Sequence, residues 1–278
     1  MLSYSSFGSG LRAIRSGDFD EAWLLPNSFR AALLAFLAGT PHRIGYATDR
    51  RGWLLTEALP APPRTRHQLR DYDALLEARH IPPDLDPPRL PLPDANLRRA
   101  EEALERAGLA DAADLVLLCP GSAVESTKRW PVDRYARLAE AISARGISVA
   151  FAVGPRDRVL SNELAEKTRA PIPVVGLDLD PVELAAVFAR ARVVVANDSG
   201  PMHLAAAVGT GVVALFGPTD PGRTGPSGSP SRILDRYVFC SPCYRDRCPY
   251  GHECMREIEV DDVLGAIEQL IGVTRPSS

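Results

Sequence analysis

The second half of the chain alternates short apolar runs with segments of helical periodicity, and this alternation limits the possible folds more than any other feature. Buried strands are predicted where the apolar runs are continuous, at Leu115–Cys119, Ile147–Val153, Pro173–Val175, Arg192–Ala196 and Gly211–Phe216. A helix is predicted in each interval between them. Strands separated by helices at this spacing predict an α/β fold with a parallel, doubly wound sheet.

The first half of the chain predicts a smaller unit of the same class. Phe19–Leu25 and His42–Tyr46 are short apolar runs that predict strands, and Phe29–Ala38 carries apolar residues at helical spacing up to Gly39. From Thr48 to Arg70 the periodicity is lost, which predicts irregular structure.

A proline-rich stretch separates these two patterns. Six of the twelve residues from Pro82 to Pro93 are proline, which excludes a helix or a central strand and predicts a stiff connector. We place the boundary there or in the helix that follows. The prediction is an N-terminal α/β domain over residues 1–95 and a Rossmann-like domain with a C-terminal helix over residues 96–278.

Composition excludes several classes of protein. The net charge of −3 excludes a protein that binds nucleic acid as a bulk polycation. The longest apolar run, Ala31–Gly39, is far shorter than the roughly 20 residues of a membrane-spanning helix. The first twenty residues do not resemble a secretory signal. These features predict a cytoplasmic protein.

The function of such a sheet is expected at the carboxyl ends of its strands, where loops lead into helix N-termini. Three loops fit this position: 120–128, 154–158 and 197–203. The chain has no GxGxxG or Walker sequence, which disfavours dinucleotide oxidoreductases and P-loop enzymes.

The loop at 197–203 predicts an anion site. Gly200 lets the backbone approach a ligand, and Pro201 starts a helix whose free amides favour a phosphate. His203 adds an imidazole on the first turn, and Asp198 suits a sugar hydroxyl. The alternative is an ordinary turn capped by Asp198 or Ser199.

The other two loops each supply one candidate ligand. Lys128 is one of only two lysines in the chain and precedes a predicted helix, so it can reach a phosphate in the same crevice. Asp157 can hold a ribose hydroxyl. For both residues the alternative is a side chain exposed to solvent.

Four of the five cysteines lie within fifteen residues, at Cys240, Cys243, Cys248 and Cys254. In a cytoplasmic protein this clustering favours a metal or redox role. A structural zinc ion, one or two disulfides, and a turn of reduced thiols are the alternatives.

The stretch 41–70 is basic, with six arginines against two carboxylates. Guanidinium groups suit the carboxylates and phosphates of an acidic substrate, which makes Arg43 and Arg64 candidate acceptor ligands. The alternative is a solvated loop.

Several of these segments together resemble glycosyltransferase family 9, the ADP-heptose:lipopolysaccharide heptosyltransferases. The resemblance rests on sequence blocks along nearly the whole chain, including PNSFR at 26–30, RIGY at 43–46, PGS at 120–122, KRWP at 128–131, VANDSGPMHLAAA at 195–207 and ALFGPTDP at 214–221. Together with the late cysteine stretch, the early blocks are most similar to heptosyltransferase II.

This resemblance implies a GT-B fold, in which two Rossmann-like domains face each other across a cleft. It implies inverting transfer of L-glycero-D-manno-heptose from ADP-heptose to the lipid-anchored lipopolysaccharide inner core, at the inner face of the inner membrane and without a catalytic metal. Lys128 and His203 would stabilise the leaving diphosphate. The implied donor ligands are Ser122, Lys128, Asp157, Asp198, Ser199, Gly200, Pro201, Met202 and His203.

The resemblance departs from the family at the beginning of the chain. Family members begin with a strand and a glycine-rich loop that carries the proposed catalytic aspartate, and nothing before Phe19 resembles that block. The N-terminal domain is therefore expected to be incomplete, with an exposed sheet edge and no identifiable general base. An ADP-sugar-binding but inactive protein and a related sugar-nucleotide epimerase are the alternatives.

Overall fold

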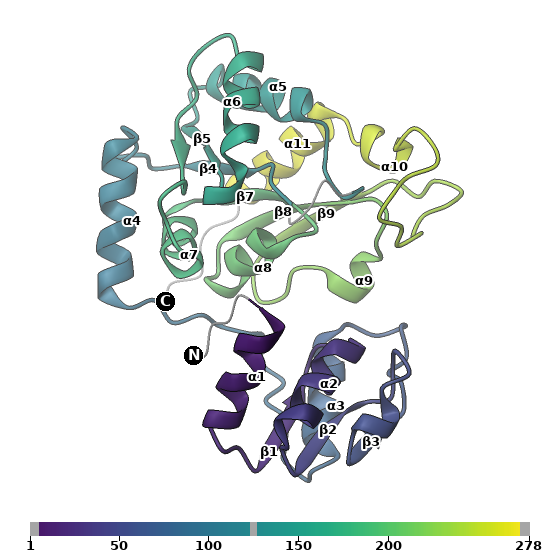
Figure 1. Ribbon diagram of the computed structural model, residues 1–278. Helices are drawn as coiled ribbons and strands as arrows, with labels where there is room; N and C mark the ends of the chain where they lie inside the picture. Colours follow the sequence, from purple (N-terminus) through teal and green to yellow (C-terminus); the bar gives the residue numbers. More distant parts are fainter. Residues whose placement is uncertain (1–5, 123–126, 273–278) are drawn as a thin grey trace. The chain divides into compact units, whose positions relative to one another are not determined.

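The computed structural model describes residues 6–122 and 127–272, and the chain divides into two compact units, one ending at Leu85 and the other beginning at Asp86 (Figure 1). This dividing point lies within the proline-rich stretch 82–93. No helix among the described residues combines the length and the apolar character needed to cross a membrane.

The smaller unit is built on a three-stranded parallel sheet in the order β1-β2-β3, in which Trp23 lies opposite Ile44 and Gly45 opposite Ala58. Its elements are α1 (Phe7–Ser16), β1 (Glu21–Leu24), α2 (Phe29–Ala38), β2 (His42–Tyr46), the 3-10 turn η1 (Gly52–Leu54), β3 (Glu57–Leu59) and α3 (Leu69–Glu77). Helix α2 begins at Phe29 because the Ser28 hydroxyl accepts from the Ala31 amide, and it ends at Gly39, which is left-handed.

The prediction of irregular structure from Thr48 to Arg70 is wrong in part, because η1 and β3 both lie there. Strand β3 has three residues and no buried run, so its sequence carries no periodic signal. It forms because β2 supplies a parallel partner.

The larger unit is built on a six-stranded parallel sheet in the order β6-β5-β4-β7-β8-β9. Its strands are β4 (Val116–Cys119), β5 (Val149–Ala152), β6 (Val174–Val175), β7 (Val193–Asn197), β8 (Gly211–Phe216) and β9 (Ser231–Asp235). Its helices are α4 (Asp94–Arg106), α5 (Val132–Ser143), the 3-10 turn η2 (Pro155–Asp157), α6 (Arg158–Lys167), α7 (Pro181–Arg190), α8 (Gly200–Ala207), α9 (Pro221–Thr224), α10 (Glu253–Arg256) and α11 (Val260–Ile271).

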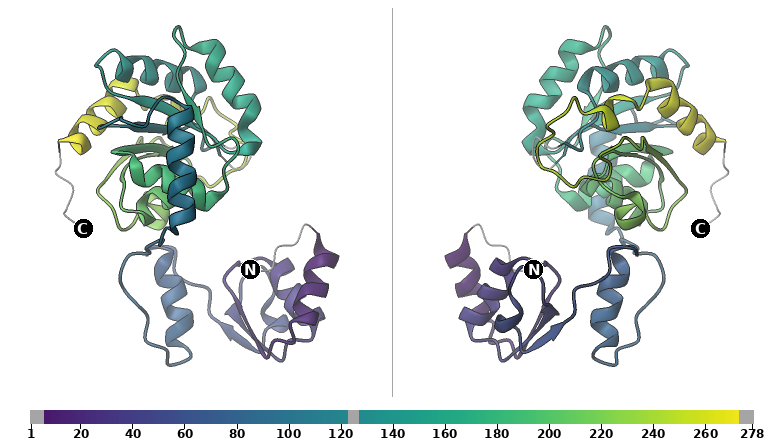
Figure 2. Two further views of the ribbon diagram at one scale, coloured as in Figure 1. Left: turned by 90° about the vertical axis from the view of Figure 1, so that its left-hand side faces the viewer. Right: turned by 90° about the vertical axis from the view of Figure 1, so that its right-hand side faces the viewer.

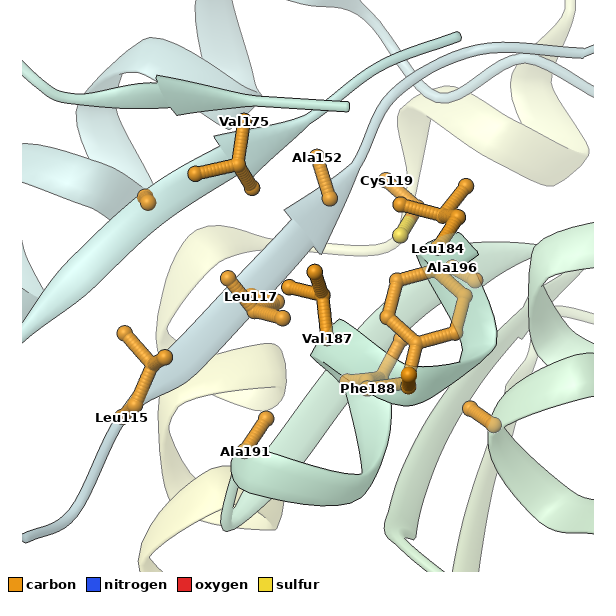
Figure 3. Packing of buried hydrophobic residues seen from close by; sticks show 14 of the residues in the cluster. Leu115, Leu117, Cys119, Ala152, Val175, Leu184, Val187, Phe188, Ala191 and Ala196 are labelled. Carbon is orange, nitrogen blue, oxygen red and sulfur yellow. The ribbon is translucent and has the colours of Figure 1, made fainter. Parts of the chain in front are cut away.

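Helices cover both faces of this sheet, as the two side views show (Figure 2). One face packs against α4, α7 and α8, and the other against α5, α6 and α11. Figure 3 shows the first face, where Val187 of α7 lies beside Leu117 of β4 and Phe188 lies near Ala196 of β7. The α/β class with a parallel, doubly wound sheet is therefore confirmed.

The strand order places a switch point between β4 and β7. From β4 the chain proceeds outward through β5 and β6, whereas from β7 it proceeds the other way through β8 and β9. In sheets of this kind the loops diverge at the switch point and leave a crevice beyond the carboxyl ends of the two strands. The loops that follow Cys119 and Asn197 lie at that crevice.

Candidate active site

The switch-point crevice brings Lys128 and Asp198 into direct contact. The Lys128 ammonium lies 2.7 Å from Oδ2 of Asp198, and the Thr219 hydroxyl donates to the same oxygen at 2.8 Å. The Asp198 side chain is 5% exposed and that of Lys128 is 36% exposed. A buried carboxylate thus holds a cation that solvent can still reach, and the three groups come from the loops after β4, β7 and β8.

A buried amide holds these loops in place. The Asn197 side chain, at the end of β7, donates to the carbonyl oxygens of Pro120 and Gly121 at 3.2 and 3.4 Å. Its Oδ1 accepts from the Trp130 amide at 3.0 Å and lies 3.2 Å from the Tyr135 hydroxyl. Asn197 therefore fixes both ends of the loop that carries Lys128, and the sequence assigned it no role.

Helix α8 begins beside this pair without a side-chain cap. Ser199 occupies the N-cap position, but its hydroxyl donates to the Asn197 carbonyl oxygen instead of accepting from the helix. The alternative of a turn capped by Ser199 or Asp198 is therefore wrong. Gly200 and His203 are exposed on the first turn, which suits an anion site at a helix N-terminus.

Met202 and Pro201, two other predicted donor ligands, differ in the groups that a ligand could contact. The Met202 side chain is fully buried in the apolar cluster below α8, so only its main chain can meet a ligand. Pro201 is half-buried at the start of the helix and has no amide hydrogen to donate.

The loops after β4 and β5 also meet. A Cβ built on Gly121 would lie 2.7 Å from a carboxylate oxygen of Asp157, so a larger residue here would force the Asp157 side chain to move. Asp157 is half-buried there, beside the loop that leads to Lys128. Ser122, also half-buried, is the last residue described before the gap at 123–126.

The cysteine-bearing segment, residues 236–256, belongs to the same edge of the sheet. It follows β9, and its Arg245 carbonyl accepts from the Thr127 hydroxyl at 2.6 Å. Its Tyr244 amide donates to Pro218 in the loop after β8 at 2.8 Å. The cysteine-bearing segment, which the sequence analysis treated separately, is thus hydrogen-bonded to the loops after β4 and β8. Figure 1 shows where it leaves β9.

All five cysteines are free thiols in the structure. Burial, together with the charge of Cys240, Cys243 and Cys248, raises the pKa of Cys254 to about 11. Within residues 6–122 and 127–272, however, no three His, Cys, Asp or Glu side chains are arranged as metal ligands. A structural zinc ion remains a prediction from the cysteine spacing alone.

The two predicted acceptor ligands lie in the smaller unit. The Arg43 guanidinium donates to the carbonyl oxygens of Leu54, Thr40 and Pro41 and lies over the Phe36 ring at 5.4 Å, so most of its donors serve the local fold. Arg64 is exposed. An acceptor role for either residue remains a prediction.

Arg51 does not fit the alternative interpretation of the basic stretch as a solvated loop. Its side chain is fully buried and donates to main-chain oxygens at the ends of β1 and β2, including Tyr46 at 2.9 Å, and to the Asn27 side chain at 3.2 Å. Burial lowers the pKa of Arg51, and the charge of Asp49 opposes that shift. The burial of Arg51 could not be predicted from the sequence, because its main-chain acceptors come together only when β1 and β2 pair.

Comparison with known proteins assigns the family. The chain matches glycosyltransferase family 9 (heptosyltransferase) over residues 8–253. It is 30% identical to lipopolysaccharide heptosyltransferase 2 of Salmonella typhimurium, covering 93% of this chain and 77% of that protein. It is 31% identical to lipooligosaccharide heptosyltransferase 2 of Haemophilus ducreyi, covering 98% of this chain and 81% of that protein.

A solved structure supports the same assignment. The ADP-heptose lps heptosyltransferase II of Escherichia coli superposes with a TM-score of 0.77 at 25% identity, over 95% of this chain and 80% of that one. This likeness confirms the GT-B class of fold. The chain belongs to glycosyltransferase family 9.

Proposed function

We propose that this chain transfers L-glycero-D-manno-heptose from ADP-heptose to the inner core of lipopolysaccharide, with inversion at the anomeric carbon. Two heptosyltransferase 2 relatives that it matches over more than 90% of its length support the reaction class. The observation that carries the proposal is the contact between Lys128 and Asp198 at the uncapped start of α8.

The leaving diphosphate is the group that most needs stabilisation. Negative charge develops on it as the bond to the anomeric carbon breaks, and fixed positive groups lower the energy of that state. Lys128 supplies a full charge, the first turn of α8 supplies its dipole, and His203 supplies an exposed imidazole on the same turn. In this proposal these groups, rather than a metal ion, provide the positive charge.

The two carboxylates bind the neutral parts of the donor. Asp198 already accepts two hydrogen bonds at one oxygen, which leaves its other oxygen for a sugar hydroxyl. Asp157, beside Gly121, takes the ribose hydroxyls of the nucleotide. Each role uses a loop at the edge of the larger sheet.

The acceptor is lipid-anchored, so we propose that the reaction occurs at the cytoplasmic face of the inner membrane through peripheral contact. Exposed arginines such as Arg64 in the smaller unit suit an anionic glycolipid.

The test is transfer from ADP-heptose to a deep-truncated lipopolysaccharide, with product identified by mass spectrometry. Lys128→Ala removes the cation that faces the diphosphate and is expected to lower kcat/KM by roughly 100-fold or more. Lys167→Ala is the matched control, because Lys167 is exposed on α6 and its ion pair with Glu163 is long, at 3.9 Å. The control is expected to retain full activity.

Two results would contradict the proposal at different points. A folded protein that binds ADP in calorimetry and yields no transfer product would instead be an inactive ADP-sugar-binding protein. Equal affinity of Lys128→Ala and the unsubstituted protein for ADP-heptose would exclude the phosphate role of Lys128.

A further inference from the structure

A second basic site lies beside the proposed donor site within the larger unit. A pocket of about 630 Å³ is bounded by the chain that follows Lys128 and by the end of the cysteine-bearing segment. Its lining includes Arg129, Arg247, Arg256 and Asp246, together with His252. The volume lies within the range of small-ligand sites.

The three arginines of this pocket pair with none of the carboxylates that the structure describes. Across the parts of the chain that the structure describes, none of the three forms an ion pair with a carboxylate. Arg256 reaches only the Gly251 carbonyl oxygen, at 3.4 Å. Among the described lining residues Asp246 is the one carboxylate, so these residues together carry a formal charge of +2 with His252 neutral.

Arg129 gives the clearest indication of a ligand. Its Nε is buried and has no hydrogen-bond partner. A buried donor without an acceptor costs free energy that an oxyanion would recover, and a guanidinium matches phosphate and carboxylate in geometry. The neighbouring Lys128 is bonded to Asp198, so consecutive cations of one loop serve two different places.

We propose that this pocket binds an oxyanion, a phosphate or a carboxylate, that the glycolipid acceptor carries. The inference rests on the proposed function, in which the donor diphosphate takes Lys128 and α8 while the second substrate must reach the same edge of the sheet. An anionic group held at Arg129 would position the acceptor next to the leaving diphosphate.

The first experiment measures anion binding without catalysis. The full chain is saturated with ADP to fill the donor site, and inorganic phosphate is added while its ³¹P linewidth is recorded. The unsubstituted protein is expected to broaden the phosphate signal, and the Arg247→Ala/Arg256→Ala double variant is expected to lose that broadening. Both residues are exposed, so the substitutions leave the core intact.

Arg137→Ala is the matched control, because Arg137 is an exposed arginine of α5 that pairs only with Asp133 one helical turn away. It is expected to broaden the signal as the unsubstituted protein does. Equal broadening by the double variant, or no broadening by the unsubstituted protein, would overturn the proposal.

The second experiment asks whether the anion belongs to the acceptor. In the transfer assay, each of Arg247→Ala and Arg256→Ala is expected to raise the KM for the acceptor roughly tenfold, the effect of one charge-assisted hydrogen bond. The KM for ADP-heptose should stay unchanged. A dephosphorylated acceptor separates the sources: loss of the arginine effect identifies a phosphate, and persistence identifies a carboxylate.

An unchanged KM for the acceptor, or a parallel rise in the KM for ADP-heptose, would overturn the assignment to the acceptor. Absence of transfer by the unsubstituted protein would contradict the proposed function, whereas the anion site is judged by the phosphate linewidth. The two failures are therefore distinguishable.

Discussion

Both parallel sheets gather the loops at the carboxyl ends of their strands around one buried polar side chain, but the two side chains differ in charge. In the larger unit this side chain is the neutral amide of Asn197, and in the smaller unit it is the guanidinium of Arg51. Each contacts loops that are distant in sequence and adjacent in the sheet.

Asn197 and Arg51 differ in the partners that each side chain needs around it. Asn197 is matched by main-chain groups and a tyrosine hydroxyl, so it needs no counter-charge. Arg51 carries a full charge into the interior, where burial lowers its pKa and the charge of Asp49 opposes the shift. The Arg51 guanidinium donates to more main-chain oxygens than the Asn197 amide does, so the loss of Arg51 breaks more of the contacts that hold the loops together.

Arg51→Ala is expected to have the largest effect on stability. It removes the donor to the Pro26 carbonyl oxygen and one of the donors to those of Ser28 and Tyr46, and it opens a cavity, for a loss of about 3–5 kcal/mol in the unfolding free energy of the smaller unit. Hydrogen exchange of peptides from residues 21–46, followed by mass spectrometry, measures this loss. Arg12→Ala, an exposed change on α1, is the control, and exchange no faster than in that control would refute the role of Arg51.

Asn197→Ala should destabilise the larger unit by about 2–3 kcal/mol, because it leaves the Trp130 amide and two carbonyl oxygens unpaired. Exchange in peptides from residues 193–216 reports the change. Asn162→Ala on the exposed face of α6 is the matched substitution and should have little effect. Transfer activity should fall with Asn197→Ala, since the loop that carries Lys128 loses its support.

Tyr135→Phe tests the same amide from the other side, with an expected loss of about 1 kcal/mol. Burial raises the pKa of Tyr135 well above its usual range, so the hydroxyl stays protonated in the folded state. The stabilisation should be constant below about pH 10, where tyrosine ionises in the unfolded chain, and should decline above it. A difference between variant and unsubstituted protein that declined already between pH 7 and pH 9 would contradict this assignment.

Asp49→Asn is expected to have the smallest effect, about 0.5–1 kcal/mol, because Asp49 is exposed and solvent screens its charge. It removes the negative charge near Arg51, and the asparagine oxygen can still accept from the Phe29 amide. In about 1 M salt the same exchange measurement should find no difference between the variant and the unsubstituted protein, because salt screens the charge of Asp49. A loss that persists in high salt would show that Asp49 acts through its hydrogen bond.

Strands with a continuous apolar run were predictable from the sequence. The predicted and observed bounds agree for β2 and β8, and the predicted bounds of α2 also agree. Strand β9 and helices α1 and α3 had no prediction. Strand β9 has no fully buried residue, and it forms because β8 provides a parallel partner.

The site was predictable as a set of loops but not as a set of contacts. Placing Lys128 and Asp198 after parallel strands needed only the alternation of the chain. The Thr219 hydroxyl and the Asn197 amide were missed because their partners are fixed by the order of the strands, which places β7 between β4 and β8. The order of the strands cannot be predicted from the local sequence.

The contact between Lys128 and Asp198 also limits which anions can bind at the site. With the two charges 2.7 Å apart, the resting site is locally neutral, and an incoming anion has to compete with a buried carboxylate for the lysine. A diphosphate can do so because it adds the dipole of α8 to the exchange. An anion with fewer contacts gains less binding free energy than the loss of the ion pair costs. The ion pair would therefore keep the site available to the nucleotide in the presence of abundant free phosphate.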